Sequence, residues 1–207
     1  GQRFARKAIG LVDPARKIDE KFFDLLFLNT TEDIKSNLAL SKKVTGSTPD
    51  KGVKELAHLV DGQYGSTKPQ DGKWVGFGVE QKTVDLIVDI GNAEMIQTVG
   101  VNVLLNPSAQ AEPPLRIQFS LSEDGNTYLP ISTTGKEGVG FFTPEVRSSS
   151  IKTMDPQSLL VIVDAGKIAA GKGNASAGTK ARYVKVSMTM ETHDIYVDEI
   201  LVNPIGK

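Results

Sequence analysis

The sequence predicts an all-β protein in which two antiparallel sheets pack face to face, with a short helical segment at the N-terminus. Three observations lead to this prediction. From residue 37 onward, apolar and polar residues alternate in short stretches, as they do in half-buried strands. Gly, Pro, Asn and Asp interrupt these stretches at short intervals. Helix-like spacing of apolar residues is confined to the first 35 residues or so. This combination is typical of a β-sandwich.

The N-terminal segment has the pattern of a helix. Asp13-Pro14 is a favourable helix start, because Asp can cap the N-terminus of a helix and Pro fits its first turn. Apolar residues then follow close to helical spacing at Ile18, Phe22, Leu25, Leu26 and Leu28. We therefore predict a helical extension or linker over residues 1–36 and one domain over residues 37–207. Its phenylalanines are expected to pack either on the chain's own sandwich or on an adjacent catalytic domain.

Six strands are predicted in the body of the chain. The alternation is plainest in Val99, Val101 and Val103, which are separated by Gly100 and Asn102. In chain order the predicted strands are Thr83 to Ile90, Ile96 to Leu105, Leu115 to Ser122, Leu159 to Val163, Arg182 to Met190 and Ile195 to Val202.

Two stretches between the predicted strands are expected to be loops. The stretch from Asn106 to Pro114 contains three prolines, which a central strand does not accommodate. The stretch from Gly166 to Lys180 is rich in Gly, Ala, Lys and Ser and has no apolar period.

Composition excludes several classes of protein. The chain has 24 basic and 25 acidic residues and a formal net charge of -1, without the basic block typical of nucleic-acid binding. The absence of cysteine excludes disulfides and thiolate metal sites. No apolar run approaches the roughly 20 residues that span a bilayer. The chain opens at Gly1, which fits either the removal of an upstream sequence or a residue left by cloning.

The sequence contains no recognisable catalytic arrangement. There are two histidines, and neither a Gly-x-Ser-x-Gly elbow nor a His-Glu-x-x-His motif occurs. The carboxylate pairs Glu123/Asp124 and Asp198/Glu199 are adjacent in sequence. Because neighbours on a regular strand point to opposite faces, we expect neither pair to act together on a substrate. The chain is therefore predicted to be non-enzymatic.

Four segments occur in an order that resembles a known superfamily. They are Leu59 to Ser66 followed by Trp74 to Phe77, then Val84 to Gly91, then Leu115 to Gly125, and finally Ala181 to Val186 with Asp198 to Ile200. This series resembles the discoidin-like (galactose-binding-like) domains, which include the C-type domains of coagulation factors and the family 32 carbohydrate-binding modules. The resemblance covers roughly residues 37–204 and implies a jelly-roll sandwich. It also implies a secreted, periplasmic or cell-surface bacterial protein, of the kind attached to glycoside hydrolases.

The resemblance also implies a structural calcium ion. In the family a carboxylate, a hydroxyl and a late Glu join backbone carbonyls around the metal, and the matching residues here are Asp61, Ser66 and Glu199. These oxygen donors suit a hard cation. The alternative is a capped turn, in which Asp61 binds backbone amides and Glu199 pairs with a lysine.

Sugars in this family bind loops at one end of the sandwich, through a ring and a few polar groups. A ring contacts the C–H face of a sugar, and charged or bidentate groups bind its hydroxyls. For each candidate residue the alternative is a solvated turn or a loop anchor. The candidates in this chain are Tyr64, Phe77, Arg116, Phe141, Phe142, His193 and Asp194.

Two functions follow from these considerations. The first is a carbohydrate-binding module that targets an attached or associated glycoside hydrolase to glycans. The alternative is a structural or protein-docking domain of a larger cell-surface hydrolase, with no sugar site of its own. Lipid adhesion, as in the coagulation-factor relatives, has little support from the near-neutral charge.

Overall fold

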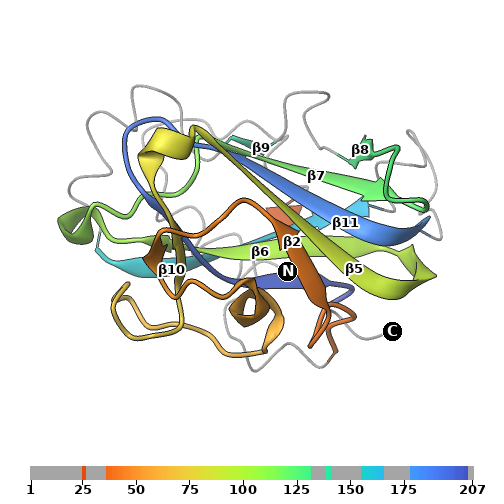
Figure 1. The fold of residues 1–207 in the computed structure, drawn as a ribbon, viewed down its shortest axis with the longest axis horizontal. Coiled ribbons are helices and arrows are strands. Elements are labelled where there is room, and N and C mark those ends of the chain that lie inside the picture. Colours follow the sequence, from red (N-terminus) through yellow and green to blue (C-terminus); the bar gives the residue numbers. More distant parts are fainter. Residues whose placement is uncertain (1–24, 27–35, 132–138, 141–154, 166–177, 205–207) are drawn as a thin grey trace.

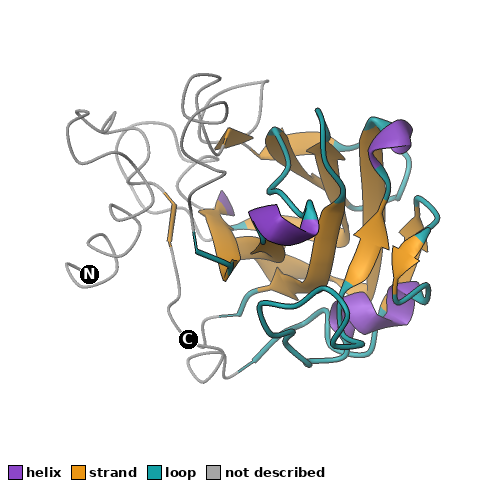
Figure 2. Cartoon of the chain, turned by 90° about the vertical axis from the view of Figure 1, so that its left-hand side faces the viewer, coloured by secondary structure: helices purple, strands orange, loops and turns teal. Residues whose placement is uncertain are grey.

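The chain folds as two antiparallel β-sheets, which confirms the predicted sandwich (Figures 1 and 2). The computed structural model describes residues 25–26, 36–131, 139–140, 155–165 and 178–204. Over this part of the chain, no helix is long and apolar enough to cross a membrane. The short 3-10 helices there are η3 (Leu56–Val60), η4 (Val79–Gln81) and η5 (Pro107–Ala109).

Each sheet has its long strands in the middle and short strands at the edges. Sheet A has the order β1 (Leu25–Leu26), β10 (Gln157–Asp164), β6 (Thr98–Leu105), β12 (Ile195–Val202), β4 (Val75–Phe77) and β3 (Lys51–Gly52). Sheet B has the order β2 (Lys43–Gly46), β5 (Thr83–Ile96), β11 (Thr179–Thr189), β7 (Arg116–Ser122) and β8 (Leu129–Ile131). The two-residue strand β9 (Val139–Gly140) also pairs with β7. Strands β2, β5, β11 and β7 run side by side in Figure 1.

The six predicted strands correspond to β5, β6, β7, β10, β11 and β12. Strand β5 continues to Ile96, beyond the predicted end at Ile90, because its last residues pair with Thr179–Ala181 at the start of β11. The last two residues of the predicted loop from Gly166 to Lys180 therefore belong to strand β11, which begins at Thr179. Its residues 166–177 lie outside the described part of the chain.

The predicted N-terminal helix is wrong at Leu25 and Leu26. These residues form β1, which pairs antiparallel with β10, with Leu25 opposite Val163. The sheet edge offers hydrogen-bond partners to this segment, and such a tertiary partner overrides the weak preference of a short isolated helix. The remaining predicted helical residues, with Phe22, Phe23 and Phe27, lie outside the described residues.

The main core lies between the sheets. Val99, Val101 and Val103 of β6 are fully buried there, together with Leu86 and Val88 of β5. This arrangement follows the alternation in the sequence.

The residues that alternate with these core positions on β6 are buried as well. Leu104 packs with Trp74 and Ala111 in a second apolar cluster, and all three side chains are fully buried. Trp74 is thus the largest side chain of this second cluster. Strand β6 is covered on both faces, whereas the outward residues of sheet B, such as Asp85 and Lys185, stay partly exposed.

Antiparallel pairing brings three connecting segments to one end of the sandwich, which we call the loop end: residues 78–82, 106–115 and 190–194. Register fixes this placement, because Thr189 lies opposite both Arg116 and Thr83. On the other sheet, Ile195 lies opposite Phe77. A backbone bond from Glu112 to Asp194 (3.2 Å) joins two of the segments.

Candidate functional site

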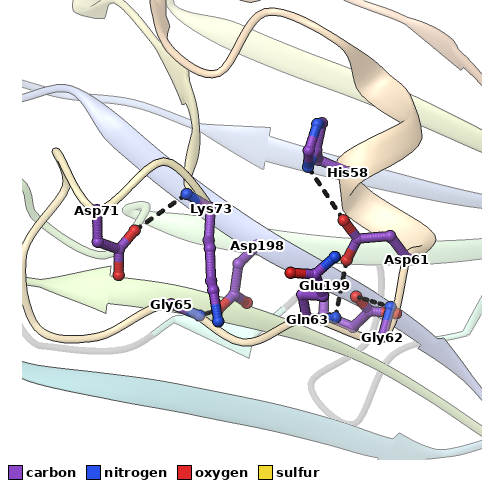
Figure 3. Close-up of polar contacts among 9 residues, drawn as sticks. All are labelled: His58, Asp61, Gly62, Gln63, Gly65, Asp71, Lys73, Asp198 and Glu199. Atoms are coloured by element: carbon purple, nitrogen blue, oxygen red, sulfur yellow. Dashed lines mark hydrogen bonds and ion pairs between the residues drawn. The ribbon is translucent and has the colours of Figure 1, made fainter.

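A β-bulge in β12 places two acidic side chains under one loop. The register of β12 with β6 shifts between Val197 and Glu199. Asp198 accepts a hydrogen bond from the amide of Gly65 (2.6 Å), and Glu199 accepts one from the amide of Gly62 (3.1 Å) (Figure 3). In a regular strand these neighbours would face opposite sides, but a bulge breaks the alternation. The regular alternation on which the expectation for this pair was based therefore does not hold at this point of β12.

Asp198 begins a polar chain that crosses sheet A and ends at the exposed Ser158. Its carboxylate accepts a bond from the side-chain amide of Asn102 on β6 (2.8 Å), whose oxygen accepts one from the hydroxyl of Ser158 on β10 (2.7 Å). Asp198 and Asn102 are buried, so these bonds satisfy groups that water does not reach. Burial raises the pKa of Asp198 to about 7.

Glu199 connects β12 to the segment before β2. Its carboxylate accepts a bond from the side-chain amide of Asn37 (3.2 Å), and the Asn37 oxygen accepts bonds from two backbone amides, each 2.9 Å away. Glu199 is fully buried. Burial, opposed by the amide bond from Gly62 and reinforced by the nearby charges of Asp198 and Asp61, raises the pKa of Glu199 to about 9.

Asp61 lies beside this cluster and caps its own turn. Its carboxylate accepts a bond from the amide of Gln63 (2.8 Å), and its other oxygen lies 3.0 Å from Nδ1 of His58 (Figure 3). The negative charge of Asp61 acts on Glu199. The structure therefore brings together two of the three predicted calcium ligands.

Ser66, the third predicted ligand, is held in a separate turn. Its hydroxyl accepts a bond from the amide of Lys68 (3.2 Å), its amide donates to the carboxylate of Asp71, and its carbonyl accepts a bond from the indole of Trp74 (2.9 Å). Within the described residues, no three His, Asp or Glu side chains come close enough to form a metal site on their own. A cation there needs hydroxyl or carbonyl ligands as well.

The donor chemistry of this cluster fits a cation. Asp61, Asp198 and Glu199 form no ion pair with any described Lys or Arg. The partners of Glu199 are Asn37 and the Gly62 amide, so the lysine partner expected for a capped turn is not the one found. Buried carboxylates without a counter-charge are costly, and a divalent cation supplies the charge they lack.

The loop end collects a different set of groups. Nδ1 of His193 lies 3.2 Å from a carboxylate oxygen of Glu112. The carboxylate of Asp194 accepts a bond from the amide of Val79 (3.1 Å), so Asp194 anchors the neighbouring loop. Arg116 is exposed at the first position of β7, at the same end. Three predicted ligand residues, Arg116, His193 and Asp194, thus lie at the loop end.

The other predicted ligand residues do not join this group. Phe77 ends β4 next to the loop end, but its side chain is fully buried in the core. Tyr64 is half-buried, and burial and the charges of Glu199 and Asp198 raise the pKa of its hydroxyl, which places it near the acidic cluster. The first half of β12, which rises about 3.3 Å per residue, separates that cluster from His193. Phe141 and Phe142 lie outside the described residues.

Sequence reasoning missed four residues that organise these sites. Glu112 sits in a proline-rich stretch that the sequence predicts only as a loop, and nothing in the sequence marks it as buried. The roles of Asn37, Asn102 and Asp198 depend on contacts between residues that are 96 to 162 positions apart. The adjacency of Asp198 and Glu199 is visible in the sequence, but the bulge that brings them under one loop is not.

No protein-family model matches the sequence, and no curated protein matches it. Among solved structures, the chain is similar to chitosan-binding module 1 of a chitosanase/glucanase from Paenibacillus, with 16% identity over 81% of this chain and 98% of that one, and a TM-score of 0.48. A fucose-binding module of Streptococcus pneumoniae has 14% identity over 81% and 94%, with a TM-score of 0.48. The lectin domain of lectinolysin, complexed with Lewis B antigen, has 15% identity over 81% and 96%, with a TM-score of 0.47. The fold assignment itself rests on the strand order and register.

Proposed function

We propose that the chain is a non-catalytic carbohydrate-binding module that uses its loop end. The observation that carries the proposal is the grouping of His193, Glu112 and Arg116 there, from the connection between β11 and β12, the connection between β6 and β7, and the start of β7. Imidazole, carboxylate and guanidinium are groups that bind sugar hydroxyls directionally. They are mounted on the ends of paired strands, which hold them in fixed relative positions.

The arrangement supports binding rather than turnover. The adjacent acids Asp198 and Glu199 are fully buried and have no surface at which to meet a substrate. At the loop end, the carboxylate of Asp194 accepts a bond from the amide of Val79, and that of Glu112 lies 3.2 Å from Nδ1 of His193. Hydrolysis of a glycosidic bond needs two carboxyl groups free to face it.

The setting of the module follows from the sequence resemblance. We propose that it is secreted, periplasmic or on the cell surface of a bacterium and targets an attached or associated glycoside hydrolase to glycans. The support is the series of discoidin-like motifs over residues 37–204. The domain boundary at residue 37 and an adjacent catalytic domain are part of the same proposal.

A glycan array followed by calorimetric titration tests the sugar site. We expect saccharide affinity in the millimolar to micromolar range, about -4 to -8 kcal/mol. His193→Ala is expected to weaken binding at least tenfold. His58→Ala is the matched control, because His58 also pairs with a carboxylate through Nδ1 but lies away from the loop end. A folded protein that binds no saccharide would favour the alternative, a structural or protein-docking domain.

We also propose a structural calcium ion held by Asp61 and Glu199, with the hydroxyl of Ser66 as a further ligand. The support is the uncompensated charge of the acidic cluster and the hard oxygen donors at this site. The ion would neutralise these carboxylates and tie the loop of residues 61–66 to β12.

Thermal unfolding with calcium and with EDTA tests the ion. We expect calcium to raise the Tm of the natural chain, since a ligand that binds only the folded state stabilises it. Glu199→Gln is expected to remove this calcium-dependent shift. Glu123→Gln is the control, because Glu123 is an exposed acid outside the cluster. Equal Tm values in calcium and EDTA would contradict a structural ion.

A further inference from the structure

The pair formed by Glu112 and His193 is built asymmetrically. The side chain of Glu112 is 11% exposed and that of His193 is 31% exposed, with 3.2 Å between Oε1 and Nδ1. The backbone holds Glu112 in place, because its amide donates to the carbonyl of Asp194 and Ala111 forms a bridge with Asp194. Pro113 and Pro114 follow it and restrict the chain. Glu112 is therefore the fixed partner of a more exposed imidazole.

The contact with Glu112 favours one position for the proton on the imidazole ring of His193. An ionised carboxylate has no proton to donate, so the 3.2 Å approach of the Glu112 oxygen to Nδ1 of His193 is favourable when that nitrogen carries the ring proton. The hydroxyl of Thr192 lies 2.7 Å from the same nitrogen. It accepts a bond when Nδ1 carries the proton and donates one when it does not, so the carboxylate of Glu112 decides between the two forms. In a neutral imidazole, Nε2 is then the acceptor. Among the described residues, Nε2 has no hydrogen-bond partner.

We propose that Glu112 is a positioning residue that fixes His193 with its proton on Nδ1 and so presents Nε2 to the ligand as a hydrogen-bond acceptor. This inference rests on the proposed sugar-binding function. An acceptor at this point binds a hydroxyl and repels a carboxylate. The loop end carries the acids Glu80, Glu112, Glu191 and Asp194 and the bases Lys82 and Arg116, so acids outnumber bases there. The site therefore selects neutral sugars over the corresponding uronic acids when the imidazole is neutral.

Nitrogen-15 NMR of the imidazoles tests the positioning role without any sugar. Measured at about pH 8, where a typical histidine is neutral, His193 is expected to show its proton on Nδ1. Glu112→Gln is expected to shift it toward the form protonated on Nε2, and Glu112→Asp to keep part of the original form. Asp61→Asn, with EDTA present, is the control, because it removes the carboxylate partner of His58 and leaves that of His193 in place. A proton on Nε2 of His193 in the natural chain would overturn the proposal, as would no response to Glu112→Gln.

Titration with sugars tests whether Nε2 of His193 accepts a hydrogen bond from the ligand. The probes are methyl galactoside, methyl glucoside and the matching uronic acids, which differ at one carbon. We expect the neutral sugar to bind at least tenfold more tightly and to shift the Nε2 resonance, and Glu112→Gln to weaken its binding about tenfold. Sugar binding that leaves Nε2 unshifted would overturn the acceptor role. If no sugar binds while the proton lies on Nδ1, the proposed function fails and the positioning by Glu112 stands.

Discussion

At the scale of single residues, the buried acids of β12 depend on amides rather than on basic groups. Asp198 is bonded to Asn102 and to the amide of Gly65, and Glu199 to Asn37 and the amide of Gly62. Amide donors satisfy the oxygens but leave their charge uncompensated, so the pKa values of both acids rise on burial. The polar partners therefore position these groups, and the proposed cation would supply the missing charge.

Asn102→Ala tests the polar chain across sheet A. The substitution leaves Asp198 and Ser158 without their shared partner, and one unsatisfied buried polar group costs about 1–3 kcal/mol. Chemical denaturation should show a loss of unfolding free energy of that size. Asn126→Ala is the matched control, because the exposed side chain of Asn126 makes only a long bond of 3.4 Å to the backbone. An equal effect of the two substitutions would contradict the role of Asn102.

Asp89 and Arg182 form a bidentate pair with two bonds of 2.7 Å. The hydrogen bond from Arg182 holds the pKa of Asp89 below its usual range. A lowered folded-state pKa contributes stability above the unfolded-state value near 3.8, and that stability is lost as the pH falls through the folded-state value. Arg182→Gln should therefore lower the urea midpoint at pH 7. The difference from the natural chain should shrink at about pH 3, and a constant difference would contradict the linkage.

At the scale of elements, the loop from η3 to β4 is packed through Gly65. Its amide bonds to Asp198, and the indole of Trp74 occupies the space where a Cβ would stand. Because Trp74 is fully buried, the ring has little room to move. The loop thus covers β12 only when this position is a glycine.

Gly65→Ala should destabilise the protein by about 1–3 kcal/mol through overpacking. Gly72→Ala is the matched control: Gly72 has a φ of +82° but open space around it, so only a backbone cost of about 1 kcal/mol applies. Thermal or urea unfolding compares the two variants. A larger loss for Gly72→Ala would contradict the tight contact with Trp74.

Periodicity predicted the long strands and failed for the short ones. Val99, Val101 and Val103 predict β6 because an alternating face must be buried wherever the strand lies. Two-residue strands such as β1 and β3 carry no period and exist only where a neighbouring strand offers partners. The helix-like pattern around Leu25 was overridden for the same reason. For the candidate site, His193, Asp194 and Arg116 were predicted from loop position, whereas the buried partner Glu112 was not.

At the scale of the molecule, residues from Ser36 onward contain nearly all of the sandwich. A chain shortened to begin at Ser36 keeps Asn37 and its bonds to β12 and loses β1. We expect it to unfold cooperatively with a loss of no more than about 2 kcal/mol, the scale of the few backbone bonds removed. Circular dichroism with urea unfolding measures this. Loss of the cooperative transition would show that residues 1–35 belong to the folding unit.

The strand order has a consequence for self-association. The outermost strands, β1, β3, β2 and β8, are two, two, four and three residues long, and β8 includes Pro130, which has no N–H to donate. A second molecule that approached these sheet edges would find few free backbone groups to pair with. Short edge strands of this kind discourage fibril growth. A protein with such short edge strands is thereby kept from polymerising with its own copies.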